Sequence, residues 1–476
     1  MQTQPSPRII GASVAELTQA YREGRLDPRE VVEVMLAAAR VAGERYRAIA
    51  TLNAEDARAA ARASAHRYRE GRALGPLDGV PVSVKDSINV AGLKRWHGSR
   101  AYDDRPPASI DGAPVRRLRE AGAVVFAKTA MPDFGQMAAG LSSQFGTILN
   151  PWNTALSPGG SSSGAAVLLA CGIGPLAVGT DMGGSVRLPG SHCGVVGLKP
   201  TQGRVAYDPP KLIGVAGPMA RSVVDAQALL TVIGAYDPAD SLSLPGRFEA
   251  APPLASPRGL RIGVWREVGY GPPVQAEVAA VLEGQAARLR AAGARVSDIA
   301  QAPFTAQDMR DMALYYDTKA AFELESLAPP RREEVLGFFR EMLEGARHHD
   351  AMSYLRAEAA ALAAAARLRQ LVDAYDFVLS PVMPVVGFAA DAVGPPGCGR
   401  FDHLGFTAWF NLSTQPAICV PVACSASGQM PIGVQLAGPR FADAGVLALA
   451  AWLERQREHV FAYPFVDPGE PAHEPE

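Results

Sequence analysis

Residues 157–204 constrain the fold and function of this chain more than any other stretch, because glycines and hydroxyl residues crowd around one short apolar segment. Residues 159–164 read GGSSSG and precede AAVLLA, and residues 179–185 read GTDMGGS. Glycine permits the tight turns in which consecutive backbone N–H groups face one concavity. We therefore interpret the stretch as an active site built from backbone turns and not as a segment of core.

Ser185 is the candidate nucleophile of this site. Gly183 and Gly184 precede it directly, and their N–H groups can point into one concavity beside the serine hydroxyl. An oxyanion that forms next to a nucleophile is stabilised by donors of this kind.

The base that would take the proton from this serine is predicted to be a lysine. The region does not clearly provide the histidine of the usual arrangement. We expect His192, which stands between Ser191 and Cys193, to be hydrogen-bonded in a packed loop. Upstream, residues 80–84 read VPVSV, an apolar strand pattern that ends in Lys85. Burial at a strand end favours the neutral amine of Lys85, which makes it the candidate base.

Several motifs resemble those of a known family. GVPVSVKD, NPWN followed by SPGGSSSGAA, and GTDMGGSVRLPGSHCGVVGLKPT match, in order and spacing, the motifs of the amidase signature family of serine hydrolases. The similarity runs from about residue 70 to about residue 240 and returns in TQPAICVPV and MPIGVQLAG. The resemblance implies that Lys85 is the base, that Ser185 is the nucleophile, and that Ser161, held in a cis peptide in that family, bridges the two.

The resemblance also implies a reaction, the hydrolysis of an amide through an acyl-enzyme. Neutral Lys85 draws a proton from Ser161, which draws one from Ser185, and the same relay returns a proton to the leaving ammonia or amine. We expect the oxyanion to be held by the N–H groups of Met182, Gly183, Gly184 and Ser185. Asp181 and Arg187 are expected to brace the loop and not to react.

The loop that starts at Thr129 is the candidate acyl pocket. In the family that the chain resembles, this loop helps to form that pocket, which makes Gly135, Gln136 and Met137 candidate substrate-binding residues. The residues alone favour an ordinary surface connection, so the two interpretations stay open.

Two other functions can be drawn from the same glycines and serines. Residues 160–164 also satisfy G-x-S-x-G, the nucleophile elbow of α/β-hydrolase esterases, which would make Ser162 the nucleophile. Such an elbow follows a buried strand, whereas NPWNTALSP indicates a loop. A phosphate-binding module would need Lys-Ser/Thr after Gly164, where the chain has Ala165-Ala166. Both alternatives are therefore disfavoured.

A further alternative lies within the resembled family, the glutaminase subunit of a tRNA-dependent amidotransferase. The residue after the motif arginine is typically glutamine in that subunit, whereas Arg187 is followed here by Leu188. The pattern favours a stand-alone hydrolase that acts on a small-molecule carboxylic acid amide. The identity of that amide and a homodimeric state both stay open.

The predicted fold class is α/β, a single large domain with a central mixed sheet flanked by helices on both faces. Helices are expected before the catalytic strand and at 113–121, and strands at 123–128, 260–265 and from Phe377, the last two in the same sheet. Within this domain we expect N-terminal helices at 1–72, a catalytic core at 73–236, a connecting loop at 237–259, and a helical part with sheet-completing strands at 260–476.

The composition limits the classes of partner and the cellular location that we expect for this chain. Lys and Arg number 46 against 48 Asp and Glu, a net charge of −2 without a basic run, so we expect neither a nucleic acid nor a membrane surface as partner. Five cysteines without CxxC spacing indicate free thiols, and no metal or cofactor is expected. MQTQPSPRII lacks the pattern of a signal peptide and no stretch is long and apolar enough to span a bilayer. These features predict a cytoplasmic protein.

Overall fold

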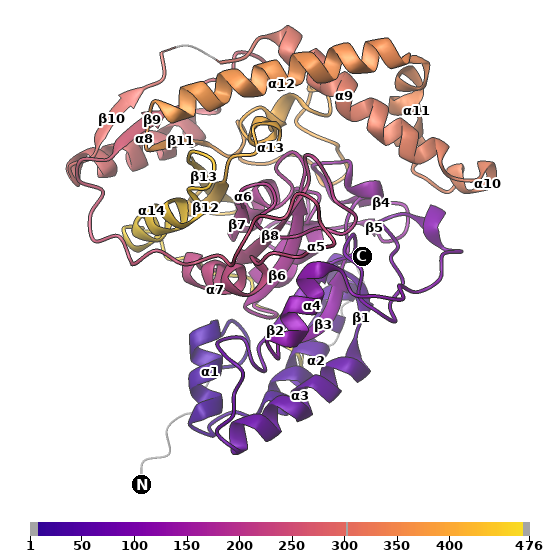
Figure 1. Cartoon of the computed structure of the whole chain (residues 1–476), viewed down its shortest axis with the longest axis vertical. Coiled ribbons are helices and arrows are strands. Elements are labelled where there is room, and N and C mark those ends of the chain that lie inside the picture. Colours follow the sequence, from indigo (N-terminus) through magenta and orange to yellow (C-terminus); the bar gives the residue numbers. More distant parts are fainter. Residues whose placement is uncertain (1–7, 301–302, 470–476) are drawn as a thin grey trace.

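The computed structural model describes residues 8–300 and 303–469 and has an 11-stranded mixed sheet at its centre (Figure 1). Its strands follow in the order β1 (Ile49–Leu52), β3 (Val124–Thr129), β2 (Pro81–Lys85), β6 (Leu176–Asp181), β8 (Val215–Ala220), β7 (Val196–Lys199), β12 (Ala417–Cys424), β13 (Pro431–Ala437), β11 (Phe377–Pro381), β9 (Arg261–Val264) and β10 (Arg295–Asp298). The prediction of a single α/β domain around a mixed sheet is confirmed.

The strands that carry the site are parallel neighbours. β2 pairs in parallel with β3 on one side and with β6 on the other, where Val84 lies opposite Val178. Because parallel strands end at the same edge of a sheet, the carboxyl ends of β2 and β6 meet there. The sheet thereby brings the lysine at the end of β2 to the glycine-rich loop after β6.

Helices cover both faces of the sheet, because strand side chains point alternately to opposite faces. On one face, Val82 and Val84 share an apolar core with α4 (Ala113–Glu120), α7 (Val223–Ile233), α8 (Ala276–Ala291) and α14 (Asp443–Arg455). On the other face, two cores include α2 (Pro28–Tyr46), α3 (Ala54–Arg69), α5 (Ser163–Ala170), α9 (Ala306–Glu325), α11 (Gly337–Glu344), α12 (Ala351–Asp373) and α13 (Ala408–Leu412). The helices α9, α11 and α12 form the layer at the top of Figure 1.

The first two N-terminal helices begin at capping residues. The helix α1 (Val14–Arg22) has a complete capping box between Ser13 and Glu16, and Asp27 caps α2 with a proline in the first turn. Residues 1–7, which belong to the segment analysed for a signal peptide, lie outside the described residues. The helices expected before the catalytic strand are therefore confirmed, as α1, α2 and α3 within residues 8–80.

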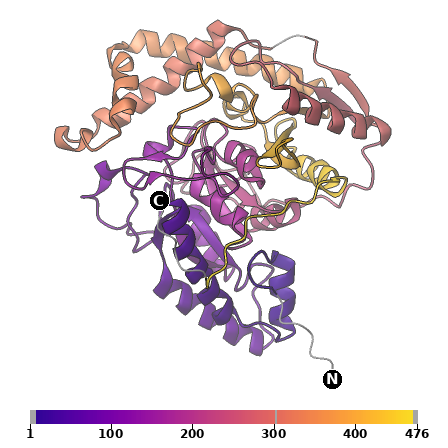
Figure 2. The same cartoon turned by 180° about the vertical axis from the view of Figure 1, so that it is seen from behind.

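The second half of the chain completes the sheet as expected. β9 and β11 pair in parallel with each other, and β11 pairs with β13, so both predicted strands join the central sheet. Residues 237–259 form an irregular connection that precedes β9. After α14 the chain returns along the back of the molecule (Figure 2), where the Val466 N–H donates to the Cys171 carbonyl.

Several of the elements that the sequence analysis did not name are short or exposed. β1 has four residues between two helices, and β10 is a mostly exposed edge strand without an apolar run. The others are α10 (Pro329–Arg332), α11, the hairpin β4 (Leu141–Ser142) and β5 (Gly146–Thr147), and the 3-10 turns η1 (Arg100–Tyr102), η2 (Asp133–Gly135), η3 (Gly345–His348) and η4 (Asp402–Leu404). Such pieces carry too few residues to show a hydrophobic period.

No helix in residues 8–300 or 303–469 is long and apolar enough to cross a membrane.

Candidate active site

Lys85 ends β2 on the face opposite the Val82 and Val84 core. Side chains alternate along a strand, so its amine points toward the side of the sheet that α5 covers. The side chain is 1% exposed. Its position at the strand end and its burial agree with the expectation from the sequence.

Ser161 lies directly beside this amine. The Nζ of Lys85 is 2.8 Å from the Oγ of Ser161 and 3.4 Å from the carbonyl oxygen of Thr180. The Gly160–Ser161 peptide bond is cis. A Cβ at Gly160 would lie 2.6 Å from the carbonyl oxygen of Met137, so only glycine fits at this close approach.

Burial sets the protonation state of Lys85. Loss of hydration in the interior penalises the ammonium form, and the Asp181 carboxylate only partly offsets this penalty. The positive charge of Lys211 lowers the pKa further, and the pKa of Lys85 falls from 10.5 to about 7. A neutral amine is therefore available near neutral pH.

Ser185 lies on the loop that follows β6 and precedes α6 (Arg187–Cys193). It is partly exposed and lines the same pocket as Ser161. Its carbonyl oxygen accepts a hydrogen bond of 3.0 Å from the Ser162 N–H, which ties the Ser185 loop to the start of α5. Ser161 and Ser185 thus line one pocket, and Lys85 lies behind Ser161, within hydrogen-bond distance of its hydroxyl.

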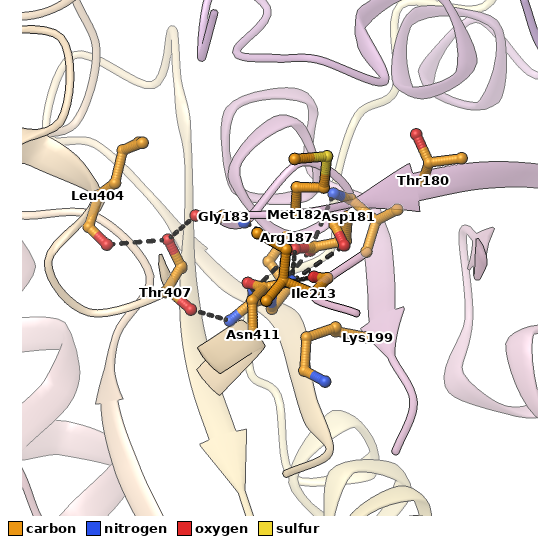
Figure 3. A network of polar contacts seen from close by, with 12 residues as sticks. Thr180, Asp181, Met182, Gly183, Arg187, Lys199, Ile213, Leu404, Thr407 and Asn411 are labelled. Atoms are coloured by element: carbon orange, nitrogen blue, oxygen red, sulfur yellow. Dashed lines mark hydrogen bonds and ion pairs between the residues drawn. The ribbon is translucent and has the colours of Figure 1, made fainter. Parts of the chain in front are cut away.

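A buried ion pair shapes the loop between Asp181 and Arg187 (Figure 3). The Asp181 Oδ1 accepts a 2.7 Å hydrogen bond from the Gly184 N–H, and Oδ2 accepts one of 3.2 Å from the Val186 N–H. Burial opposes ionisation of Asp181, but the Arg187 guanidinium and the hydrogen bonds to the carboxylate lower its pKa to about 2. The expected bracing by Asp181 and Arg187 is present.

The prediction that the Gly184 N–H is an oxyanion donor is wrong. The Gly184 N–H is held by Asp181 and is therefore not free for an oxyanion. The N–H groups of Met182, Gly183 and Ser185 have no acceptor among the described residues, and all three residues line the pocket surfaces around the nucleophile. The sequence shows two glycines but not which of their amides the aspartate takes.

Residues far along the chain hold the carbonyl groups of the same loop. The Tyr316 hydroxyl donates to the Met182 carbonyl at 2.5 Å, and the Thr407 hydroxyl donates to the Gly183 carbonyl at 2.7 Å. Asn411 Nδ2 donates to the Asp181 carbonyl at 2.9 Å (Figure 3). Sequence reasoning missed these partners, because single polar residues on apolar helices give no motif.

The space around Ser185 has two compartments that share Gly135, Met182 and Ser185. The compartment that holds Lys211, named the polar compartment here, is further lined by the polar residues Ser87, His97, Ser161, Thr180, Tyr207 and Lys211 and by Met131, Phe134, Gly214 and Val215. The apolar compartment is further lined by Met137, Leu188, Tyr316, Phe401 and Leu404. Gln136 also lines the apolar compartment, so all three predicted substrate-binding residues, Gly135, Gln136 and Met137, border the site.

Ser162 does not have the environment of a nucleophile elbow. It is fully buried, and a loop precedes it where an elbow needs a strand. Its hydroxyl donates to the Thr180 carbonyl at 3.2 Å and accepts from the Thr180 N–H at 3.3 Å. The side chain therefore joins α5 to β6 and is not available for attack.

The histidines form no metal site in the described part of the chain, where no group of three or more His, Cys, Asp and Glu side chains is placed to hold a metal ion. The Nδ1 of His192 lies 3.0 Å from the Ser157 carbonyl oxygen. Burial lowers the pKa of His192 to about 4. The imidazole is neutral and hydrogen-bonded, as expected.

Comparison with known proteins gives the family. The Amidase family model matches residues 30–447. A glutamyl-tRNA(Gln) amidotransferase subunit from Geobacter metallireducens is 31% identical, with 94% of this chain and 97% of that protein covered. A bacterial aryl acylamidase of the amidase signature enzymes has a TM-score of 0.85 at 25% identity, covering 94% and 96% of the two chains. A 6-aminohexanoate cyclic dimer hydrolase, solved with its substrate, has a TM-score of 0.82 at 28% identity, covering 94% and 98%. The chain therefore belongs to the amidase family, the amidase signature hydrolases.

Proposed function

We propose that this chain is an amidohydrolase that cleaves a small-molecule carboxylic acid amide through an acyl-enzyme on Ser185. The observation that carries the proposal is the 2.8 Å contact between the buried Lys85 Nζ and the Ser161 Oγ, in a pocket that Ser185 also lines. A serine is a weak nucleophile without a base, and a desolvated lysine supplies one. We also propose that residues 73–236 are the catalytic core of the domain.

Proton transfer runs through the two serines. Neutral Lys85 accepts a proton from Ser161, which accepts one from Ser185 as the Ser185 oxygen attacks the carbonyl carbon. The C–N bond breaks when Ser161 returns a proton to the amine, which leaves as a neutral molecule. Water, deprotonated through the same relay, then attacks the acyl-enzyme and releases the acid.

The oxyanion is stabilised by backbone donors, for which we propose Met182, Gly183 and Ser185. A peptide bond places its C=O and N–H in opposite directions. Since the Met182 carbonyl binds Tyr316, the Gly183 N–H of the same peptide points away from Tyr316. Donors fixed in this way need no reorganisation when negative charge develops.

A glutaminase subunit of a tRNA-dependent amidotransferase is the second candidate. Relatives named as glutamyl-tRNA(Gln) amidotransferase subunits in Geobacter metallireducens and Anaeromyxobacter are 31% and 33% identical to the chain. Leu188 stands where glutamine is typical of the glutaminase, and its side chain lines the apolar compartment. This favours a stand-alone enzyme, for which we propose a cytoplasmic location, no membrane partner, and no metal or cofactor. The expectation that the chain has no nucleic-acid partner conflicts with these relatives, whose names refer to a tRNA.

The two candidates are separated by one experiment. The purified chain is incubated with primary amides, anilides and glutamine, and the products are identified by mass spectrometry. Hydrolysis of an amide or anilide by the chain alone supports the amidohydrolase. Turnover of glutamine only, and only after an amidotransferase partner protein is added, would assign the chain to the second class.

A further inference from the structure

The polar compartment carries a positive charge that the proton relay does not need. Lys211 is the formally charged side chain in its lining, and its ammonium lies 5.3 Å from the centre of the Tyr207 ring. No ion pair or hydrogen bond of this ammonium is present among the described residues. The backbone beside it is fixed, because the Lys211 carbonyl accepts a 2.7 Å bond from Gln202 Nε2.

The other titratable groups near the compartment leave this charge in place. Burial lowers the pKa of His97, so its imidazole is neutral at pH 7. Glu323 lies behind His97, with Oε1 2.9 Å from the His97 Nδ1 and 3.1 Å from the Tyr102 hydroxyl. Glu323 is not part of the lining, but the charges of Lys211 and Glu323 attract each other, and Lys211 helps to lower the pKa of this carboxyl. Glu323 therefore offsets part of the Lys211 charge from behind His97, while Lys211 is the charged side chain that borders a ligand in the compartment.

The relay decides which half of an amide enters each compartment. This step rests on the proposed function, in which Ser161 returns the proton to the amine. Ser161 lines the polar compartment but not the apolar one, so the amine half lies on the side of Lys211. The acyl half then lies in the apolar compartment, against Met137 and Tyr316.

We propose that the chain selects amides with an apolar or aromatic acyl group and a carboxylate on the amine half, that is, N-acyl amino acids, and that Lys211 is the residue that binds the carboxylate. Water adds across the C–N bond, so that the carbonyl carbon gains oxygen, the nitrogen gains hydrogen, and an apolar acid and an amino acid leave. A hydrogen bond between two charged groups gives a preference of about 10- to 100-fold in kcat/KM, and the lower end is expected here because Lys211 is partly exposed.

The substrate test uses N-phenylacetylglycine and N-isobutyl phenylacetamide, in which a branched alkyl group replaces the carboxylate at equal size. The released phenylacetate is measured by chromatography at pH 9, above the titration of Lys85. We expect the wild-type chain to prefer the carboxylate substrate about 10- to 100-fold. Equal kcat/KM values, or a preference for the isobutyl amide, would overturn the proposal.

Variants assign the preference to one side chain. Lys211→Met should bring the ratio of the two kcat/KM values to about one, and Lys211→Arg should restore most of it. Lys319→Met is the matched control, because the Lys319 ammonium also lies over a tyrosine ring, 4.8 Å from the centre of Tyr315, but lines neither compartment. An unchanged ratio in Lys211→Met refutes the role of Lys211. If the wild-type chain hydrolyses neither amide, the proposed function itself is refuted.

Discussion

The protonation of Lys85 predicts a specific pH dependence of the reaction. With a pKa of about 7, about half of the amine is neutral at pH 7, whereas an ordinary lysine would have about one neutral molecule in 3,000. Burial therefore increases the supply of the neutral base by roughly three orders of magnitude. Because the pKa is lowered, the active form is present above pH 7 and is lost as the pH falls through this value.

The measurement is kcat/KM between pH 5 and pH 9, which reports ionisations of the free enzyme. We expect kcat/KM to rise with pH in a single limb with a midpoint near pH 7, so that kcat/KM at pH 5 is about a hundredfold below its alkaline plateau. Lys85→Arg keeps a positive charge but cannot release a proton at these pH values. It should lose nearly all activity at every pH.

A second buried lysine provides the control. Burial and the nearby Arg187 lower the pKa of Lys199 to about 7 as well, but its Nζ donates to the Pro200 carbonyl at 2.9 Å and it lines neither compartment. Any activity that remains in Lys199→Met should keep the same limb. Wild-type rates and an unchanged limb in Lys85→Arg, or loss of the limb in Lys199→Met, would refute the assignment of the base.

Three further outcomes follow from the site. Ser185→Ala should lower kcat by a factor of about 10⁴ or more in a discontinuous product assay, whereas Ser162→Ala should keep most of the turnover. The reverse result would support Ser162 as the nucleophile of an esterase-type elbow. Thr407→Val should lower kcat about 3- to 10-fold with little change in KM, because the Gly183 carbonyl on the loop between Asp181 and Arg187 loses its hydrogen bond. An unchanged kcat would argue against a positioning role of Thr407. Arg187→Met leaves the Asp181 carboxylate buried without a countercharge, so the free energy of unfolding measured by urea denaturation should fall by about 3–5 kcal/mol. The surface pair of Arg266 and Glu283 is the control: Arg266→Met should lower the free energy of unfolding by less than about 1 kcal/mol. Equal losses in the two variants would show that burial of the Asp181 charge is not the cause.

The sequence could predict those parts of the fold and site that depend on local pattern. The buried strand that ends in Lys85 and the helix that follows Ser161 are continuous apolar segments bounded by polar or glycine residues. The long helices α9 and α12 repeat their apolar positions over 20 and 23 residues. In each case the information lies within one element, so no knowledge of the tertiary structure is needed.

The partners of the catalytic loop could not be predicted in the same way. Thr407 and Asn411 contact the loop across more than two hundred residues of sequence, and nothing in the AWFNL segment indicates that contact. Lys211 and His97 reach the polar compartment from irregular segments whose conformation depends on tertiary contacts. Side chains of this kind become functional only through the fold that brings them together.

These long-range contacts couple substrate fit to the chemical step. Tyr316 lines the apolar compartment and also holds the Met182 carbonyl. Leu404 lines the same compartment, and its carbonyl accepts a 2.9 Å bond from the Thr407 N–H, while the Thr407 hydroxyl donates to the Gly183 carbonyl. An acyl group that displaces Tyr316 should therefore also turn the Met182–Gly183 peptide, whose Gly183 N–H is a proposed oxyanion donor. An acyl group that displaces Leu404 should shift Thr407 and, through it, the Gly183 carbonyl of the same loop. For this reason, acyl groups of the wrong shape should be rejected through a lower kcat as well as through weaker binding.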